Sequence, residues 1–217
     1  MKVQTIGHTQ FKSRNHTIRF ADDVARCVNK SFPRISSTKV EEFVNINAFR
    51  NLKNRLNEET ENNLRAEISC NYDKADNFLG KILAFIKPIK KYKLGNCGES
   101  AQLAAIVSKI NGIKNCHIAQ LCDKNGIDLD HSVLFVNDKK PYIIDCWLGF
   151  ADYVPNTLNK YKNLYNKIFK INDNNQLTFF TNINDEYTYC LKNNLTRTQK
   201  NKLRRIYPEL YIKKGYV

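Results

Sequence analysis

The sequence predicts an α+β fold, with helices in the first half of the chain and an antiparallel sheet in the second. Apolar residues recur at three- and four-residue spacing up to about residue 86, whereas short β-branched and aromatic runs follow residue 115. No regular alternation of strand and helix is visible, which argues against βαβ units. With 217 residues, 42% of them hydrophobic, the chain can build one domain with a substantial core. We therefore expect a single domain over residues 21–217, after a polar and flexible segment over residues 1–20.

Three helices are expected in the first half, over residues 20–31, 40–69 and 75–86. The second has an apolar face, formed by Phe43, Ile46, Phe49, Leu52 and Leu56. The third should end before Pro88, because a proline disfavours the helical conformation of the residue that precedes it.

Four strands are expected in the second half, over residues 116–122, 131–136, 141–147 and 176–181. The second and third are separated by an Asn/Asp turn, which is typical of an antiparallel hairpin. A basic helical region should follow at about residues 195–217, with a helix that begins at Thr196 and runs to about Ile206.

The chain carries 35 Lys and Arg residues against 21 Asp and Glu residues, a net charge of +14. Half of this excess lies in residues 191–217. Such a segment attracts an acidic protein or an anionic membrane surface, or it is simply a solvated face without a dedicated partner. Zinc-ligand spacing and RNA-binding motifs are missing from the sequence, so we expect no specific nucleic acid, and a basic nucleic-acid- or membrane-binding adaptor is the non-enzymatic alternative. The candidate surface contacts are Arg197, Lys200, Arg204 and Arg205.

The seven cysteines are odd in number and form no CxxC pair, which predicts a reducing compartment rather than a disulfide framework or a paired-cysteine zinc site. We expect no metal and no cofactor. The first 20 residues lack the apolar core of a cleavable signal peptide, and no apolar run reaches the roughly 18 residues that span a bilayer. Both cytoplasmic residence and specialised secretion through a polar N-terminus fit this pattern.

The most informative segment is residues 93–113, where a glycine turn precedes an Ala-rich helix. Asn96 is a good N-cap, and Glu99, three residues later, can bond back to the cap's N–H. Cys97 then lies in the first helical turn, where unsatisfied N–H groups and the helix dipole favour thiolate over thiol. Gly98 leaves the sulfur uncrowded. The alternative is that Cys97 is an ordinary buried cysteine, but the other six lack such a turn.

A cysteine nucleophile needs a base within hydrogen-bond reach and a group that orients the base. His131 opens the expected strand 131–136 and Asp145 lies near the end of the next strand, so an antiparallel hairpin makes them neighbours. Their separation is even, so they face each other only if the hairpin loop has an odd number of residues. We expect a three- or five-residue loop centred on Asp138. An even loop would pair His131 with Cys146 instead, and Asp128 or Asp130 would then be the substitute for Asp145.

The order Cys97, His131, Asp145, with a helix before two strands, resembles the papain-like and transglutaminase-like cysteine enzymes. The segments GNCGESAQLA, DHSVLFV and IIDCWLG look most like bacterial toxin and type III effector enzymes, including dermonecrotic-toxin-type glutamine deamidases. This resemblance covers about residues 94–150. It implies Cys97 as nucleophile, His131 as general base and acid, and Asp145 as orienter. Trp147 matches the aromatic of the family's DPW-type motif, with a cysteine in place of the proline.

The resemblance also implies a papain-like or transglutaminase-like fold, in which the nucleophile helix packs on an antiparallel sheet. Papain-type proteases place an oxyanion-hole glutamine six residues before the nucleophile, where this chain has Lys91. The oxyanion would then be bound by backbone N–H groups such as that of Cys97, together with Asn96 or another side chain, in the oxyanion and substrate region formed by Asn96, Gly98 and Trp147, which favours the transglutaminase-like branch. The implied activity is hydrolysis of an amide in a host protein by a secreted virulence effector acting in the host cytosol. Glutamine deamidation is preferred, and a cysteine protease or a transglutaminase is the alternative.

Overall fold

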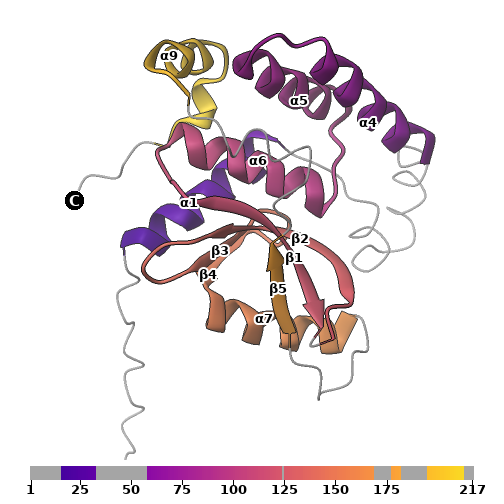
Figure 1. Cartoon of the computed structure of the whole chain (residues 1–217), viewed down its shortest axis with the longest axis vertical. Helices are drawn as coiled ribbons and strands as arrows, with labels where there is room; N and C mark the ends of the chain where they lie inside the picture. The colour runs from indigo at the N-terminus through magenta and orange to yellow at the C-terminus, as the bar shows by residue number, and fades with distance from the viewer. Residues whose placement is uncertain (1–15, 33–57, 124, 169–176, 182–194, 213–217) are drawn as a thin grey trace, which may run out of the picture.

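The computed structural model describes residues 16–32, 58–123, 125–168, 177–181 and 195–212. These residues form six α-helices and a five-stranded antiparallel sheet, with helices on both of its faces (Figure 1). The predicted α+β class is therefore confirmed. Residues 1–15, most of the predicted helix over residues 40–69, and residues 213–217 lie outside the described part of the chain.

The sheet has the strand order β4-β3-β2-β1-β5. Its strands are β1 (Cys116–Asp123), β2 (Asp128–Val136), β3 (Tyr142–Asp145), β4 (Phe150–Tyr153) and β5 (Leu177–Thr181). The first four follow one another through short connections, and β5 then returns to pair with β1. The four predicted strands are all present. The sequence analysis missed β4, whose four residues carry only a weak strand pattern.

Two helices, α1 (His16–Ser31) and α6 (Cys97–Ile110), pack on one face of the sheet, and α7 (Val154–Ile168) packs on the other (Figure 1). The larger core lies on the side of α1 and α6, and its fully buried members include Val24, Leu103, Ile106, Leu134 and Ile144. The smaller core, on the side of α7, is formed by Ala119, Leu121, Val133, Ile143 and Tyr161. The sequence analysis predicted no helix in the region of α7.

A helical hairpin of α4 (Glu58–Asp73) and α5 (Phe78–Tyr92) lies on the outer side of α6 (Figure 1). The prediction that α5 ends before Pro88 was wrong, because α5 runs through the proline. A proline inside a helix costs about 3 kcal/mol through its lost hydrogen bond and steric clash. Burial of Pro88 and Ile89 in the core offsets that cost, and the helix ends instead where Lys93 adopts the left-handed conformation, with φ of 54°.

The helix predicted to begin at Thr196 is confirmed as α9 (Arg197–Ile206). The Thr196 side chain accepts a hydrogen bond from the Gln199 N–H, and the Gln199 side chain bonds back to the Thr196 N–H. The helical region is shorter than the predicted 195–217, because Pro208 begins a single 3₁₀ turn, η2 (Pro208–Leu210). This C-terminal segment docks on the C-terminal end of α6.

Candidate active site

The candidate nucleophile, Cys97, is the first residue of α6. The backbone N–H of Asn96 donates to Glu99 Oε2 at 2.8 Å, which is the predicted half of the capping box that starts the helix. The Cys97 side chain is half-buried, and its Sγ lies 3.6 Å from the carbonyl oxygen of Asp130. A Cβ atom at Gly98 would meet no atom within 4 Å from outside its own helical turn, and Gly98 lines the same cleft as Cys97.

β2 bulges at residues 129–131, and the carbonyl of Asp130, within this bulge, lies next to the Cys97 sulfur. The β1–β2 register changes between the pair Gln120–Ser132 and the pair Cys122–Asp128, so three residues of β2 lie opposite one residue of β1. Asp130, within this bulge, has φ of 53°, a left-handed conformation that aspartate tolerates better than most residues. Bulges of this kind redirect a side chain, and here the redirected residue is His131. The sequence pattern did not predict it.

The β2–β3 hairpin has the odd loop that the sequence analysis required. Val136 pairs with Tyr142, which leaves the five-residue loop 137–141. Its centre is Lys139 rather than the predicted Asp138, so Asp145 is offset along the sheet instead of standing directly opposite His131. The two side chains still meet, with His131 Nε2 and Asp145 Oδ2 2.8 Å apart.

The Asp145 carboxylate is fully buried and has three hydrogen-bond partners. Besides His131, the Tyr161 hydroxyl donates to Oδ2 at 2.5 Å, and the backbone N–H of Leu148 donates to Oδ1 at 2.8 Å. Burial alone would raise the pKa of Asp145, but the positive charge and hydrogen bond of His131, with the other two bonds, lower it. Tyr161 was missed because it comes from α7, an element that was not expected.

The His131 imidazole is also buried, between the rings of Trp147 and Tyr161, whose centroids lie 5.3 Å and 5.4 Å away. Burial would lower the pKa of His131, but Asp145 and, to a smaller extent, Cys97 raise it to about 9. The ring is therefore an imidazolium at neutral pH. Since Nε2 is bonded to Asp145, Nδ1 is the nitrogen that remains for Cys97.

The sequence analysis named six catalytic and oxyanion candidates. Five of them line one surface cleft of about 420 Å³: Cys97, His131, Asn96, Gly98 and Trp147. Asp145 stands behind His131 and does not line the cleft. At the rim, Arg65 of α4 forms an ion pair with Glu99 of α6, with Nε and Oε1 3.3 Å apart. Arg65 was not a candidate in the sequence analysis, because its position depends on how α4 packs beside α6.

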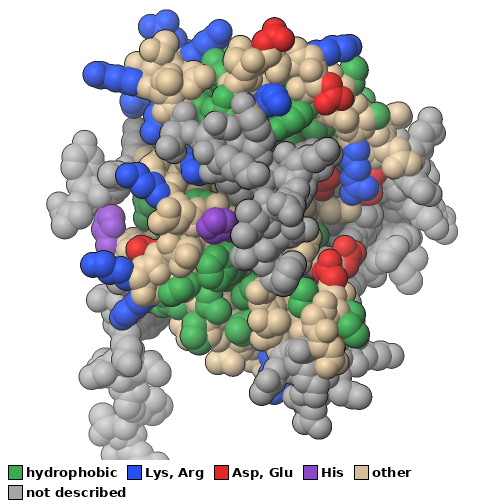
Figure 2. All heavy atoms as spheres, viewed as in Figure 1, with side chains coloured by type: hydrophobic (Ala, Val, Ile, Leu, Met, Phe, Trp, Pro, Cys, Tyr) green, Lys and Arg blue, Asp and Glu red, His purple; other side chains and the backbone are tan. Residues whose placement is uncertain are grey.

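The predicted basic contacts lie elsewhere. Arg197, Arg204 and Arg205 are exposed on α9 and Lys200 is half-buried there; Figure 2 shows Lys and Arg side chains gathered around this helix. The segment that carries α9 is bonded to Asn111, at the opposite end of α6 from Cys97. Since α6 has 14 residues, about 20 Å of helix separate the two sites.

The other cysteines of the described ranges lack comparable surroundings. Cys27 and Cys70 lie on α1 and α4, Cys116 and Cys122 are buried in β1, and Cys146 is buried after β3. Burial raises the pKa of Cys116 to about 12. The last cysteine, Cys190, falls outside the described residues.

Within the ranges that the structure describes, no cluster of three or more His, Cys, Asp or Glu side chains could hold a metal ion. No helix in those ranges is both long enough and apolar enough to cross a membrane. The chain matches no family model, no curated protein and no solved structure. The geometry of the described residues is therefore the basis for assigning a function.

Proposed function

We propose that this protein is a thiol hydrolase with a papain-like or transglutaminase-like arrangement, in which Cys97 attacks an amide. One observation carries the proposal: a thiol at the open start of a helix lies beside an imidazole that is bonded to a buried carboxylate. The three groups have the roles of nucleophile, proton carrier and orienter.

The first half of the reaction forms a thioester. The Cys97 sulfur, beside His131, attacks the carbonyl carbon of a carboxamide as the thiolate and makes a C–S bond. The backbone N–H of Cys97, at the first helical position, has no acceptor within the helix and is available to the oxyanion. The Asn96 N–H is not available, because Glu99 occupies it. His131 then donates its proton to the nitrogen, the C–N bond breaks, and ammonia leaves.

The second half hydrolyses the thioester. Neutral His131 takes a proton from water, the water oxygen bonds to the acyl carbon, and the C–S bond breaks. The products are a carboxylic acid and the starting thiolate–imidazolium pair. Throughout, Asp145 keeps Nε2 bonded so that Nδ1 faces the sulfur.

We propose the side chain of a glutamine in a host protein as the substrate, and a secreted effector that acts in the host cytosol as the biological context. The resemblance over residues 94–150 to toxin and effector deamidases supports both statements. The cleft supports a macromolecular substrate, because it lies on the surface and an extended side chain can enter it. Peptide cleavage and transamidation use the same three groups and differ only in the leaving group or the acceptor.

The test compares wild-type protein with Cys97→Ala and with Cys70→Ala, an exposed cysteine outside the cleft, after incubation with host-cell lysate. Proteome-wide mass spectrometry then records glutamine-to-glutamate conversions, new N-termini and amine adducts. We expect conversions with wild type and Cys70→Ala and none with Cys97→Ala. New termini instead would assign proteolysis. If no modification of any kind depended on Cys97, the proposed function would be wrong.

A further inference from the structure

The basic side chains of α9 have no role in the proposed reaction. Half of the ten residues of this helix are Lys or Arg and none is acidic. Four of the five basic side chains are exposed, the fifth is half-buried, and Figure 2 shows Lys and Arg side chains gathered around the helix. We call these five residues the α9 basic face: Arg197, Lys200, Lys202, Arg204 and Arg205.

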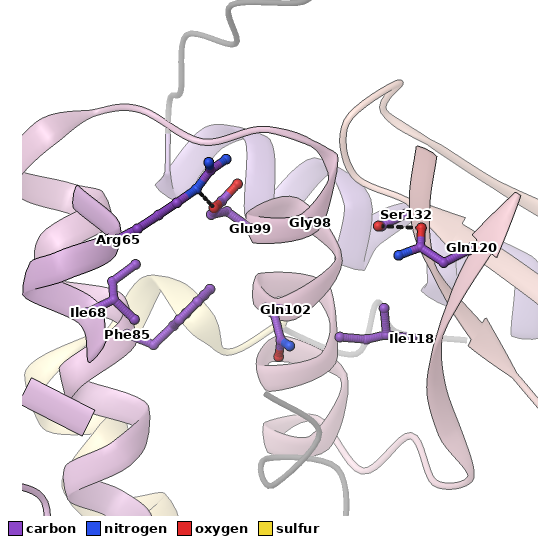
Figure 3. Close-up of a pocket in the computed structure, with 9 residues that line it drawn as sticks. All are labelled: Arg65, Ile68, Phe85, Gly98, Glu99, Gln102, Ile118, Gln120 and Ser132. Carbon is purple, nitrogen blue, oxygen red and sulfur yellow. Dashed lines mark hydrogen bonds and ion pairs between the residues drawn. The ribbon is translucent and has the colours of Figure 1, made fainter. Parts of the chain in front are cut away.

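The positive charges of the α9 basic face are not neutralised within the described part of the chain. No described carboxylate forms an ion pair with any of the five side chains. The acid that follows α9 in the sequence, Glu209, is paired with Lys90. At the cleft, by contrast, Arg65 is paired with Glu99, as the dashed line in Figure 3 shows. An unneutralised positive surface favours an anionic partner.

The fold holds this face in place. Leu203 anchors α9 in the core, where it is fully buried. The Tyr211 hydroxyl donates to the backbone carbonyl of Lys200, and the guanidinium of Arg204 lies over the Tyr211 ring, 5.3 Å from its centroid. The basic side chains therefore project from a helix that is already docked, so a partner does not have to order the helix when it binds.

An exposed apolar side chain adjoins the α9 basic face. Ile206 is 44% exposed, and only one other large apolar side chain of the described residues is exposed. It follows Lys202 by four positions, which makes the two side chains neighbours on the helix surface. Nucleic-acid phosphates or an acidic protein would match the charge but offer Ile206 no apolar contact. A lipid surface offers both, because its anionic headgroups lie directly over acyl chains.

We propose that the α9 basic face binds the surface of a membrane that contains anionic lipids. A cluster of about four to eight Lys and Arg residues on an amphipathic helix is typical of such binding, and each adds roughly fivefold to the affinity. Leu203 and Tyr207 stay in the core, so the helix lies on the membrane without inserting. Of its apolar side chains, Ile206 is the one that reaches the acyl chains.

Membrane binding through α9 leaves the cleft uncovered. The segment that carries α9 is bonded to Asn111 at the C-terminal end of α6, and Cys97 lies about 20 Å away at the other end. The inference does not depend on the chemistry of Cys97. Together with the proposed function, it places the enzyme on the cytosolic leaflet, whose lipids are anionic, with the cleft available to a protein substrate.

The experiment measures co-sedimentation of the full-length protein with phosphatidylcholine vesicles that either contain or lack phosphatidylserine. Wild type is compared with the triple variant Arg197→Gln/Lys202→Gln/Arg205→Gln, whose three side chains are exposed. We expect wild type to bind the vesicles that contain phosphatidylserine and not the others. The triple variant should bind about 100-fold more weakly, because three contributions of about fivefold are lost.

Two further variants separate the α9 basic face from net charge and from anions in general. The control Lys74→Gln/Lys139→Gln/Lys162→Gln removes the same charge at three exposed positions outside α9, and it should keep the wild-type affinity within a few-fold. Ile206→Asn keeps the charge and should bind severalfold more weakly, because it loses the apolar contact.

Four results would overturn the inference. They are no binding by wild type, equal binding to vesicles without phosphatidylserine, equal losses in the two triple variants, and an unchanged affinity of Ile206→Asn. The last would mean that the face binds anions in general, such as an acidic protein. The two vesicle types decide the inference in wild type even if the α9 variant does not fold. Cys97→Ala should bind like wild type, so a failure of the proposed function is observed separately.

Discussion

The two ends of α6 are built in opposite ways. At the C-terminal end, the Asn111 side chain donates to the carbonyls of Val107 and Leu210, both at 2.8 Å, and accepts from the Ile212 N–H at 2.9 Å. At the N-terminal end, the Asn96–Glu99 box caps the helix within its own first turn, and Cys97 faces a cleft. The C-terminal segment of the chain thus covers one end of the helix, whereas the first residue at the other end faces the cleft.

The cysteines near these two ends show the same contrast. Cys116, just beyond the C-terminal end, is 3% exposed, and its thiol faces the backbone carbonyls of Ile113 and Lys114. Burial raises its pKa to about 12, which keeps it a thiol at neutral pH. Cys97 is half-buried beside a positively charged His131. Under the proposed function, it is these surroundings, and not the residue type, that make Cys97 the nucleophile and leave Cys116 inert.

The largest expected effect is the loss of catalysis at the open end. Cys97→Ala should lower turnover by about 10⁴-fold or more, because Cys97 is the cysteine that interacts with His131 among the described residues. Cys116→Ala should keep the wild-type rate, although the small cavity it leaves will lower the melting temperature. Steady-state rates on the modified target, with thermal melting of each variant, check this. Turnover by a normally folded Cys97→Ala protein would contradict the comparison.

The next effect comes from the group behind the histidine. Asp145→Asn should reduce the rate by about 10²–10⁴-fold, since the imidazole loses both its countercharge and its fixed tautomer. Asp130→Asn serves as the matched control, because only the backbone carbonyl of Asp130 faces Cys97. Both variants are compared in kcat on the same target. If Asp130→Asn were the more damaging change, the orienter would be assigned to the wrong carboxylate.

The buried pair also predicts how stability depends on pH. The folded-state pKa of His131, about 9, is above its ordinary value of 6.5, so its contribution is complete below pH 6.5 and is lost as the pH rises to about 9. The free energy of unfolding should fall by up to about 3 kcal/mol across that window. The lowered pKa of Asp145 adds a second loss at acid pH, as the pH falls through and below 3.8.

Urea unfolding at a series of pH values checks this prediction. His131→Gln should flatten the curve between pH 6.5 and 9, and Cys116→Ala should leave its shape unchanged below about pH 8, because the raised pKa of Cys116 affects stability only above that pH. A wild-type curve that stays level between pH 6.5 and 9 would show that His131 is not held as an imidazolium.

A smaller effect is expected from Tyr161. Tyr161→Phe removes one hydrogen bond to the Asp145 carboxylate and leaves the ring contact with His131 in place. A hydrogen bond to a charged group contributes about 1.5–3 kcal/mol, so stability should decrease by that order. We expect a loss of about tenfold in kcat with little change in KM, because Tyr161 acts through Asp145. A change in KM alone would instead place Tyr161 in substrate binding.

The smallest effect on the rate is expected from the basic residues of α9, near the C-terminal end of α6. Replacing Arg197, Lys200, Arg204 and Arg205 with Gln should lower the rate on a protein target only a few-fold, and only at low salt. At physiological salt, the interaction between exposed charges is largely screened beyond roughly 8 Å. The 14-residue helix α6 separates α9 from the cleft. Rates measured at several salt concentrations, with a short peptide as the uncharged control substrate, test this. An equal loss on the peptide would mean that α9 supports the fold of the site.

The sequence analysis found those parts of the site that local signals encode. The Asn96–Glu99 cap and the strand ends at His131 and Asp145 are visible because each depends on residues within a few positions. Tyr161 was missed, since its hydrogen bond to Asp145 forms only when α7 packs on the sheet. The bulge that contains His131 was also missed, because no glycine marks it. Pro88 misled the prediction of α5, since burial outweighed a local preference.

The most direct test of the central claim is the reactivity of each cysteine toward iodoacetamide at about pH 6, measured by mass spectrometry of the separate cysteine peptides. If His131 stabilises the thiolate at the open end of α6, Cys97 should react on the order of 10–100-fold faster than the exposed Cys70. The variant His131→Gln should remove that advantage and leave Cys70 unchanged. Equal rates for Cys97 and Cys70 in wild type, or a Cys97 rate that does not depend on His131, would contradict the account.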